Sequence, residues 1–418
     1  MAMVGSSLSG DGRISVTNRA ARARGAGMKQ RLLKLEVENF LSLRRITLPL
    51  RGLNVLVGPN GAGKTNVLEV FRFLADVIRT DLEPALSLRG GFDEVVFWGG
   101  EQAPSSFRIK LEATWTRNSS ANAPDEYELR VTRTPRGGLS RRELFRFKRT
   151  QGPGRRITVS GQKVLVEDDG HREFGISRMS SGLSTLRRLS DAEGGTEVAA
   201  VANRLASFRV FDVRVDGARL PSRMHHHDHS VLDQDAANLA GFLLTFRHQH
   251  PARWERLVED ATAVLPQLED IDFEYPSGAA REVVVVLRER GLRRPTQLAD
   301  ASYGTVRLLG MLALLYDPHP PALTCVEEID HGLHPQALEL LVDRLREASE
   351  RTQFLVATHS PALADRLRPE ELVICERRDD GSSDIPAIPT THIRRIQAAS
   401  DDLPLGELWF SGALGGDL

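Results

Sequence analysis

A glycine-rich segment near residue 60 carries the residue types best suited to bind phosphate. It reads Gly58-Pro59-Asn60-Gly61-Ala62-Gly63-Lys64-Thr65 and is followed by Asn66. Glycines let backbone N–H groups turn toward phosphate oxygens, and a helix N-terminus after them adds a favourable dipole. Lys64 offers a positive charge to the β- and γ-phosphates, and Thr65 offers a hydroxyl ligand to Mg²⁺. The segment therefore predicts a site for a nucleoside triphosphate and Mg²⁺.

Two consecutive carboxylates, Glu327 and Glu328, follow the apolar run Leu323–Val326. A buried strand that ends in carboxylates places them at the carboxyl edge of a parallel sheet, where open α/β sheets bind ligands. We expect Glu327 to hold the Mg²⁺ ion and its waters, and Glu328 to activate the attacking water. A solvated acidic turn is the alternative, and the phosphate-binding segment argues against it.

Two further segments carry residues that suit the same site. His359 follows the apolar run Phe354–Ala357, and a neutral imidazole at a strand end can sense the γ-phosphate or hold the attacking water. Ser302 and Gly304 precede an apolar helix expected from Val306. Ser302 either caps that helix or, with Gly304, covers the γ-phosphate of a second subunit. Spacing within one sequence does not separate these two interpretations.

Hydrophobic patterns place these residues on an α/β framework. The run Leu53–Val57 predicts a buried strand leading into the glycine-rich loop, and the pattern from Val67 to Ile78 predicts a helix after it. From Ala322 onward, strands and helices alternate, which indicates a parallel sheet. The pattern also predicts a helix over Pro361–Leu367, and a single strand over Ile157–Val166.

Together with the glycine-rich loop, these patterns predict an α/β P-loop fold with a mixed or parallel sheet, an antiparallel β insertion and a helical lobe. The expected divisions are a disordered tail over 1–27, nucleotide-binding parts over 28–100 and 281–395, the β insertion over 101–190, the helical lobe over 191–280 and a C-terminal tail over 396–418.

The order of the motifs resembles that of ABC-type ATPases of the RecF, OLD and SMC kind. It is most similar to the compact AAA-family ATPases of bacterial defence and mobile-element operons. The resemblance implies that Glu327 is the Walker B acid and Glu328 the catalytic glutamate. It further implies a signature motif at Ser302–Thr305, a D-loop at Gly332–Pro335 and a switch histidine at His359.

The chain departs from the family pattern at a few positions. Ala301 and Tyr303 replace the usual signature residues, and Ile329 stands where proline is common. Gln102 is a candidate for the Q-loop residue.

The resemblance implies a cytoplasmic ATPase that binds ATP and Mg²⁺ and acts as a dimeric switch. It is expected to form an ATP-sandwiched homodimer or a higher oligomer, and to control a separate nuclease-like effector in anti-phage defence. A RecF- or SMC-like repair ATPase that itself binds DNA is the first alternative. A transporter subunit is the second alternative. It ranks last because the Leu-Ser-Gly-Gly-Gln signature that such subunits normally carry is absent from the sequence.

Composition limits the partners. The formal net charge is −1, so only a local basic segment, such as the stripe from Arg130 to Lys163, would favour DNA. No apolar run reaches the length of a membrane span. Cys325 and Cys375 stand in apolar runs and are expected to be buried thiols of a reducing compartment.

Two weaker features leave alternatives open. The residues His225, His226, His227, Asp228 and His229 are more typical of a solvated loop than of a metal site. The aromatic pair Trp409 and Phe410 in the C-terminal tail either packs on its own domain or docks a partner protein.

Overall fold

The computed structural model describes residues 31–415 except 153, 168–170, 189, 225–228 and 277–281. The N-terminal segment expected to be disordered and residues 225–228 of the histidine loop lie outside the described residues. Among the described residues, no helix combines the length and the apolarity needed to cross a membrane.

A five-stranded parallel sheet forms the centre of the molecule, in the order β10-β15-β16-β3-β17. Every residue of β3 is buried, as expected for a parallel strand covered on both faces. Its side chains alternate between two separate hydrophobic cores, with Val55 and Val57 in one core and Leu56 in the other. The bounds are β3 Leu53–Val57, β10 Arg209–Phe211, β15 Leu323–Glu327, β16 Gln353–Thr358 and β17 Leu372–Ile374.

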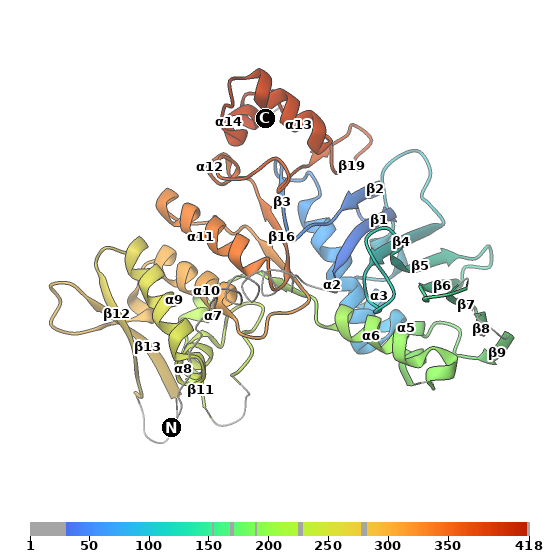
Figure 1. Ribbon diagram of the computed structural model, residues 1–418, viewed down its shortest axis with the longest axis horizontal. Coiled ribbons are helices and arrows are strands. Elements are labelled where there is room, and N and C mark those ends of the chain that lie inside the picture. The colour runs from blue at the N-terminus through green and yellow to red at the C-terminus, as the bar shows by residue number, and fades with distance from the viewer. Residues whose placement is uncertain are drawn as a thin grey trace, which may run out of the picture.

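An eight-stranded antiparallel sheet lies on one side of this centre, in the order β2-β1-β4-β5-β6-β7-β8-β9 (Figure 1). Its first strands are β1 and β2, so the strands expected as an insertion extend a sheet that begins before the glycine-rich loop. The prediction of one strand over Ile157–Val166 is wrong, because a turn at Gly161, with φ 56°, separates β7 from β8. The bounds are β1 Leu32–Phe40, β2 Leu43–Pro49, β4 Ser106–Ala113, β5 Asp125–Arg133, β6 Leu139–Phe147, β7 Arg155–Ser160, β8 Lys163–Glu167 and β9 His171–Gly175.

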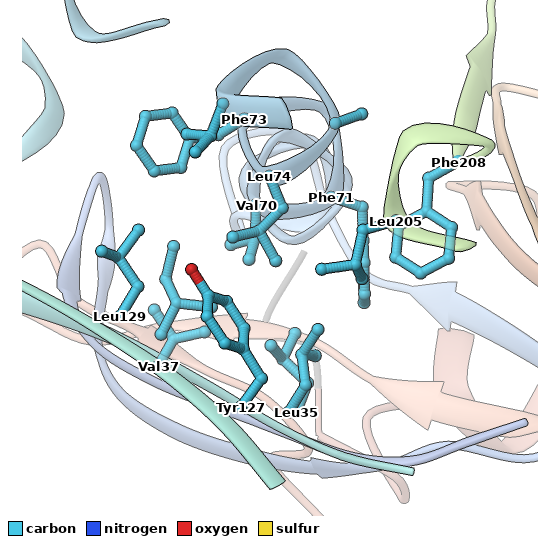
Figure 2. Packing of buried hydrophobic residues seen from close by; sticks show 14 of the residues in the cluster. Leu35, Val37, Val70, Phe71, Phe73, Leu74, Tyr127, Leu129, Leu205 and Phe208 are labelled. Carbon is cyan, nitrogen blue, oxygen red and sulfur yellow. The ribbon is translucent and has the colours of Figure 1, made fainter. Parts of the chain in front are cut away.

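Helix α2, Lys64–Thr80, follows the glycine-rich loop and packs between the two sheets. Figure 2 shows Leu35 and Val37 of β1, with Tyr127 of β5, facing the helix. On the same helix, Phe71 meets Phe208 edge to face at 5.7 Å between ring centroids. The remaining elements on this side are α3 Leu82–Ser87, α4 Phe92–Val95, α5 Gly182–Thr185, η1 Leu186–Arg188, η2 Asp191–Glu193 and α6 Gly195–Ala206.

The second core lies under a helical lobe on the opposite face of the parallel sheet (Figure 1). The apolar helix expected from Val306 is confirmed as α10, in which every residue from Val306 to Tyr316 is buried. A small sheet in the order β11-β13-β12, with β14 beside β13, completes the lobe. The bounds are α7 Val215–Ala218, β11 Ser222–Arg223, α8 Leu239–Gln249, α9 Pro251–Val264, β12 Leu268–Glu274, β13 Glu282–Glu289, β14 Thr296–Gln297, η3 Leu298–Asp300, α10 Tyr303–Tyr316 and α11 Pro335–Ala348.

The C-terminal segment returns to the head. The helix expected over Pro361–Leu367 is shorter and ends at Ala364. Trp409 is 1% exposed and packs in the protein's own core, so its interpretation as a partner anchor is wrong, whereas Phe410 is 64% exposed. The bounds are α12 Pro361–Ala364, β18 Glu376–Arg377, β19 Ser383–Asp384, α13 Thr390–Ala399 and α14 Leu405–Phe410.

Candidate functional site

The candidate site lies at the carboxyl edge of the parallel sheet, where several strands end side by side. In the strand register, Thr358 at the end of β16 pairs with Val57, the residue before Gly58. Glu327 at the end of β15 pairs with Ala357 on the other side of β16. The chain therefore brings the glycine-rich loop, the acidic pair and the histidine segment to one rim.

The glycine-rich loop leads directly into α2, whose N-cap is Gly63. Gly63 has φ 95°, a left-handed conformation that favours glycine, and a Cβ there would collide with Ser383. Lys64 donates from Nζ to the main-chain oxygens of Gly58 at 2.7 Å and Pro59 at 2.9 Å. Burial lowers the pKa of Lys64, and nearby acidic groups offset this shift only in part. The negative charge of a bound polyphosphate would stabilise the charged ammonium group.

A hydroxyl and a carboxylate meet beside this loop. Thr65 Oγ1 lies 3.4 Å from Glu327 Oε2, and Arg72 of α2 reaches Glu327 Oε1 at 3.4 Å. Burial is the main cause that raises the pKa of Glu327, while Arg72 acts in the opposite direction. A hydroxyl oxygen next to a carboxylate is a donor set that Mg²⁺ prefers, so these two side chains fit the ion expected from the sequence.

The second carboxylate lies in the turn after β15. Glu328 is exposed, has φ 47°, and its Oε2 lies 3.6 Å from His331 Nδ1. His359 is exposed at the end of β16. Just before it, Thr358 donates a hydrogen bond to Asp330, a residue of the Glu328 turn. The histidine segment and the turn are therefore tied together.

The signature segment begins helix α10. Ser302 is its N-cap and accepts a hydrogen bond from Thr305 N at 3.2 Å, so the capping interpretation holds within this chain. Ser302 and Tyr303 are nevertheless exposed, which leaves the helix N-terminus open to a second molecule. Gln102 is exposed in the loop between α4 and β4.

A cavity of about 490 Å³ lies next to the glycine-rich loop, and several of its residues were missed by the sequence analysis. Arg377 of β18 lines it and donates to the main-chain oxygen of Gly61 at 3.1 Å. Asn66 donates to Ser42 at 2.7 Å on another wall. Trp98, 69% exposed, offers an aromatic face there. Asn66 follows the predicted glycine-rich loop, whereas no motif marks Arg377 or Trp98, because they come from separate segments that only the fold brings together.

The basic stripe from Arg130 to Lys163 is largely neutralised. Arg130 pairs with Glu38, Arg146 with Glu126, and Arg155 with Glu197, at 2.8 to 3.4 Å. Arg141 is fully buried beside Glu143. Because these acids come from neighbouring strands and α6, the linear sequence does not show the pairing, and the stripe is a weak argument for binding a phosphate backbone. Among the described residues, no group of three or more His, Cys, Asp or Glu suits a metal ion.

The fold and the rim geometry define a P-loop ATPase of the ABC type. A family model described as "AAA domain, putative AbiEii toxin, Type IV TA system" matches residues 53–365, and the chain belongs to this family, whose members are usually ATP hydrolases. The resemblance read from the motifs is thus confirmed, and so is the predicted fold class.

Known proteins match over short segments. The chain is 46% identical over 55 residues to the OLD nuclease of Thermus scotoductus and 40% identical over 84 residues to the DNA replication and repair protein RecF of Myxococcus xanthus. These segments cover 13% and 20% of this chain, but only 10% and 20% of those proteins.

Solved structures show the same fold over most of the chain. An Smc head bound to the C-winged helix domain of ScpA matches with a TM-score of 0.53 and 15% identity, over 85% of this chain and 96% of that one. An Smc head with an extended coiled coil, bound to the C-terminal domain of ScpA derived from Pyrococcus furiosus, matches with a TM-score of 0.52 and 13% identity. This match covers 89% of this chain and 100% of that one.

Proposed function

We propose that this chain binds and hydrolyses ATP with Mg²⁺ and acts as an ATP-driven dimeric switch. The observation that carries the proposal is the convergence of Lys64, Thr65, Glu327, Glu328 and His359 at one rim of the parallel sheet. Family membership supports the same activity.

Each side chain has a distinct task in this proposal. The backbone of Gly58–Thr65 and Lys64 bind the β- and γ-phosphates, while Asn66 orients the start of α2 through Ser42. Thr65 and Glu327 would hold Mg²⁺, which would supply positive charge beside the phosphate oxygens. Glu328 accepts the proton of the attacking water, and His359 orients the γ-phosphate.

The cavity beside the loop is the proposed place of the nucleobase. Asn66 lines it, and Arg377, which also lines it, donates to Gly61 of the loop, so a triphosphate held by the loop would extend its base into this cavity. Trp98 presents an exposed ring for stacking, and Arg377 presents donors for the base or ribose.

A second copy of the chain would complete the site. Ser302 and Tyr303 are exposed at the N-terminus of α10, where the helix dipole favours a phosphate. In the proposed homodimer, Ser302 and Gly304 of one subunit cover the γ-phosphate held by the other.

We further propose that the switch acts in cytoplasmic anti-phage defence and controls a separate nuclease-like effector. The family description names a toxin of a toxin–antitoxin system, and one relative is a nuclease. Phe410, 64% exposed beside the buried Trp409, is the proposed contact for the effector, since exposed aromatic side chains anchor interfaces. Phe410→Ala should lose the effector in a pull-down without loss of ATPase turnover.

The activity is tested with Glu328→Gln. This variant should bind ATP, form a dimer that sedimentation detects, and hydrolyse at least about 100-fold more slowly, the usual effect of losing a general base. The matched control is Glu350→Gln, an exposed glutamate just after α11. Unchanged turnover in Glu328→Gln would contradict the assignment of Glu328.

One further measurement distinguishes the effector-controlled switch from a repair-type ATPase that itself holds DNA. ATPase turnover is compared with and without double-stranded DNA over a series of salt concentrations. Contacts to the phosphate backbone weaken steeply as salt rises, so stimulation by DNA that disappears with salt would favour the repair role. Equal turnover in all conditions would favour the effector-controlled switch.

A further inference from the structure

Arg307 connects the signature helix to the turn that carries Glu328. It lies in α10, five residues after Ser302, and its side chain is almost completely buried. Its guanidinium donates to the main-chain oxygens of Val213 at 2.7 Å, Glu328 at 2.6 Å and Glu327 at 3.2 Å. One side chain thus joins the segment that follows β10 to the end of β15.

The backbone that Arg307 holds is in a conformation that needs support. Glu328 has φ 47°, in the left-handed region that is unfavourable for a residue with a Cβ. Its main-chain oxygen accepts hydrogen bonds from Arg307 and from His331 N at 3.0 Å. Because the backbone of a residue sets the direction of its Cα–Cβ bond, these bonds fix the direction in which the Glu328 side chain leaves the main chain.

The first turn of α10 packs on the same segment. Tyr303 lies against His331, with 5.4 Å between ring centroids. Gly304 approaches Gly332 so closely that a Cβ on residue 304 would lie 2.7 Å from the main-chain oxygen of Gly332. The start of α10 and residues 327–332 are therefore bound to each other at three places, and a displacement of one displaces the other.

We propose that Arg307 is a positioning residue that couples the two ATP sites of the dimer. Contact of the partner's nucleotide with Ser302 and Gly304 fixes α10, and Arg307 transmits this to the Glu328 turn of the same chain. Each subunit then hydrolyses its own ATP efficiently only when its signature segment covers the partner's ATP. The inference rests on the proposed function, since it requires hydrolysis in a dimer.

Arg307→Lys tests this coupling, because lysine keeps the positive charge but cannot span three carbonyl oxygens. Arg351→Lys is the matched control: Arg351 also donates to main-chain oxygens, those of Leu315 and Asp317, at the opposite end of α10. We expect Arg307→Lys to lower kcat about 10- to 100-fold, as loss of an orienting contact does. KM for ATP should stay within about twofold, and the Hill coefficient should fall toward one. Arg351→Lys should keep both kcat and the Hill coefficient.

If Arg307 had a purely structural role, a different result would be expected. Turnover would then follow thermal stability, and the two lysine variants would lose activity in proportion to their loss of Tm. That result, or unchanged cooperativity in Arg307→Lys, would overturn the inference.

Hydrogen exchange keeps the inference testable without hydrolysis. With ATP added, the backbone amides of residues 327–332 should exchange more slowly in the wild type but not in Arg307→Lys. Equal protection in both proteins would overturn the coupling. A wild type that binds ATP and never hydrolyses it would contradict the proposed function instead.

Discussion

The hydroxyl oxygen of Thr65 lies 3.4 Å from Oε2 of Glu327, although 262 positions separate the two residues in the chain. The contact joins the start of α2 to the end of β15. Arg72 holds the other oxygen of the same carboxylate, and burial raises its pKa. Arg72 thus places positive charge beside this half-buried carboxylate, and a divalent cation beside Thr65 would supply more of it.

The affinity for Mg²⁺ in the presence of ATP should fall as the medium becomes acidic. A raised pKa means that Glu327 takes up a proton at higher pH than a free glutamate does, and the proton competes with the metal ion. Titration with Mg²⁺ between about pH 5 and pH 8 measures the change. In Glu327→Gln the affinity should be weak and nearly independent of pH. A full pH dependence in that variant would assign the proton to another group.

The sign of the stability effect follows from the same shift. A carboxylic acid whose pKa is raised on folding contributes stability below its unfolded pKa, and this contribution is lost as pH rises through the folded pKa. Mg²⁺ binds the ionised carboxylate, which forms as pH rises through the folded pKa, so stabilisation by Mg²⁺ and ATP, measured as a shift in Tm, should be larger at neutral than at acidic pH.

Trp98→Ala should weaken ATP binding without changing the chemical step. Stacking of a base on an aromatic ring contributes about 1–3 kcal/mol, so KM should rise roughly tenfold while kcat stays within about twofold. Leu88→Ala removes an equally exposed apolar side chain, 70% exposed, outside the residues that line the cavity, and serves as the control. An unchanged KM in Trp98→Ala would place the base elsewhere.

A buried carboxylate, Glu143, should be important for stability. It accepts hydrogen bonds from Tyr127 Oη at 3.0 Å, Ser181 Oγ at 2.9 Å and Gly182 N at 2.7 Å, and pairs with the buried Arg141 at 3.4 Å. Burial raises its pKa despite these partners. Glu143→Ala leaves Arg141 without its counter-charge and should lower the free energy of unfolding by about 3–5 kcal/mol.

Denaturant unfolding at neutral pH measures this loss. Tyr127→Phe, which removes one hydrogen bond to the carboxylate, should cost about 1.5–3 kcal/mol. A loss below about 1 kcal/mol for Glu143→Ala would mean that Arg141 finds other partners.

The parts of the site that the sequence predicts are those carried by local patterns. The strand Leu53–Val57, the glycine-rich loop and the helix after it are contiguous, so periodicity and glycine spacing identify them. The apolar runs before Glu327 and His359 predict strands that end at one sheet edge, and the register places them there.

The parts that the sequence does not predict depend on contacts between distant segments. Arg377 meets Gly61 across 316 positions, and Ser383 meets Ser42 across 341, because a short C-terminal hairpin folds back over the loop. β12 carries acids at Glu269, Asp270 and Asp272, which hide its strand pattern. Its pairing with the apolar β13 overrides that weak local preference.

The C-terminal helix α14 should support the site although it lies outside it. Gly406 packs against the main-chain oxygen of Pro361 with no room for a Cβ, and Glu407 N donates to Asp365 at 3.1 Å. Pro361 begins α12 two residues after His359, so pushing α14 away should loosen the histidine segment. Gly406→Ala is expected to lower the free energy of unfolding by about 1–3 kcal/mol and to lower kcat more than it changes KM.

Phe410→Ala, which alters the exposed face of the same helix, is the control. Its free energy of unfolding should stay within about 0.5 kcal/mol of wild type, and it should keep its turnover. Equal kcat in Gly406→Ala and Phe410→Ala, at a temperature where both are folded, would show that α14 stabilises the domain without holding His359 in place.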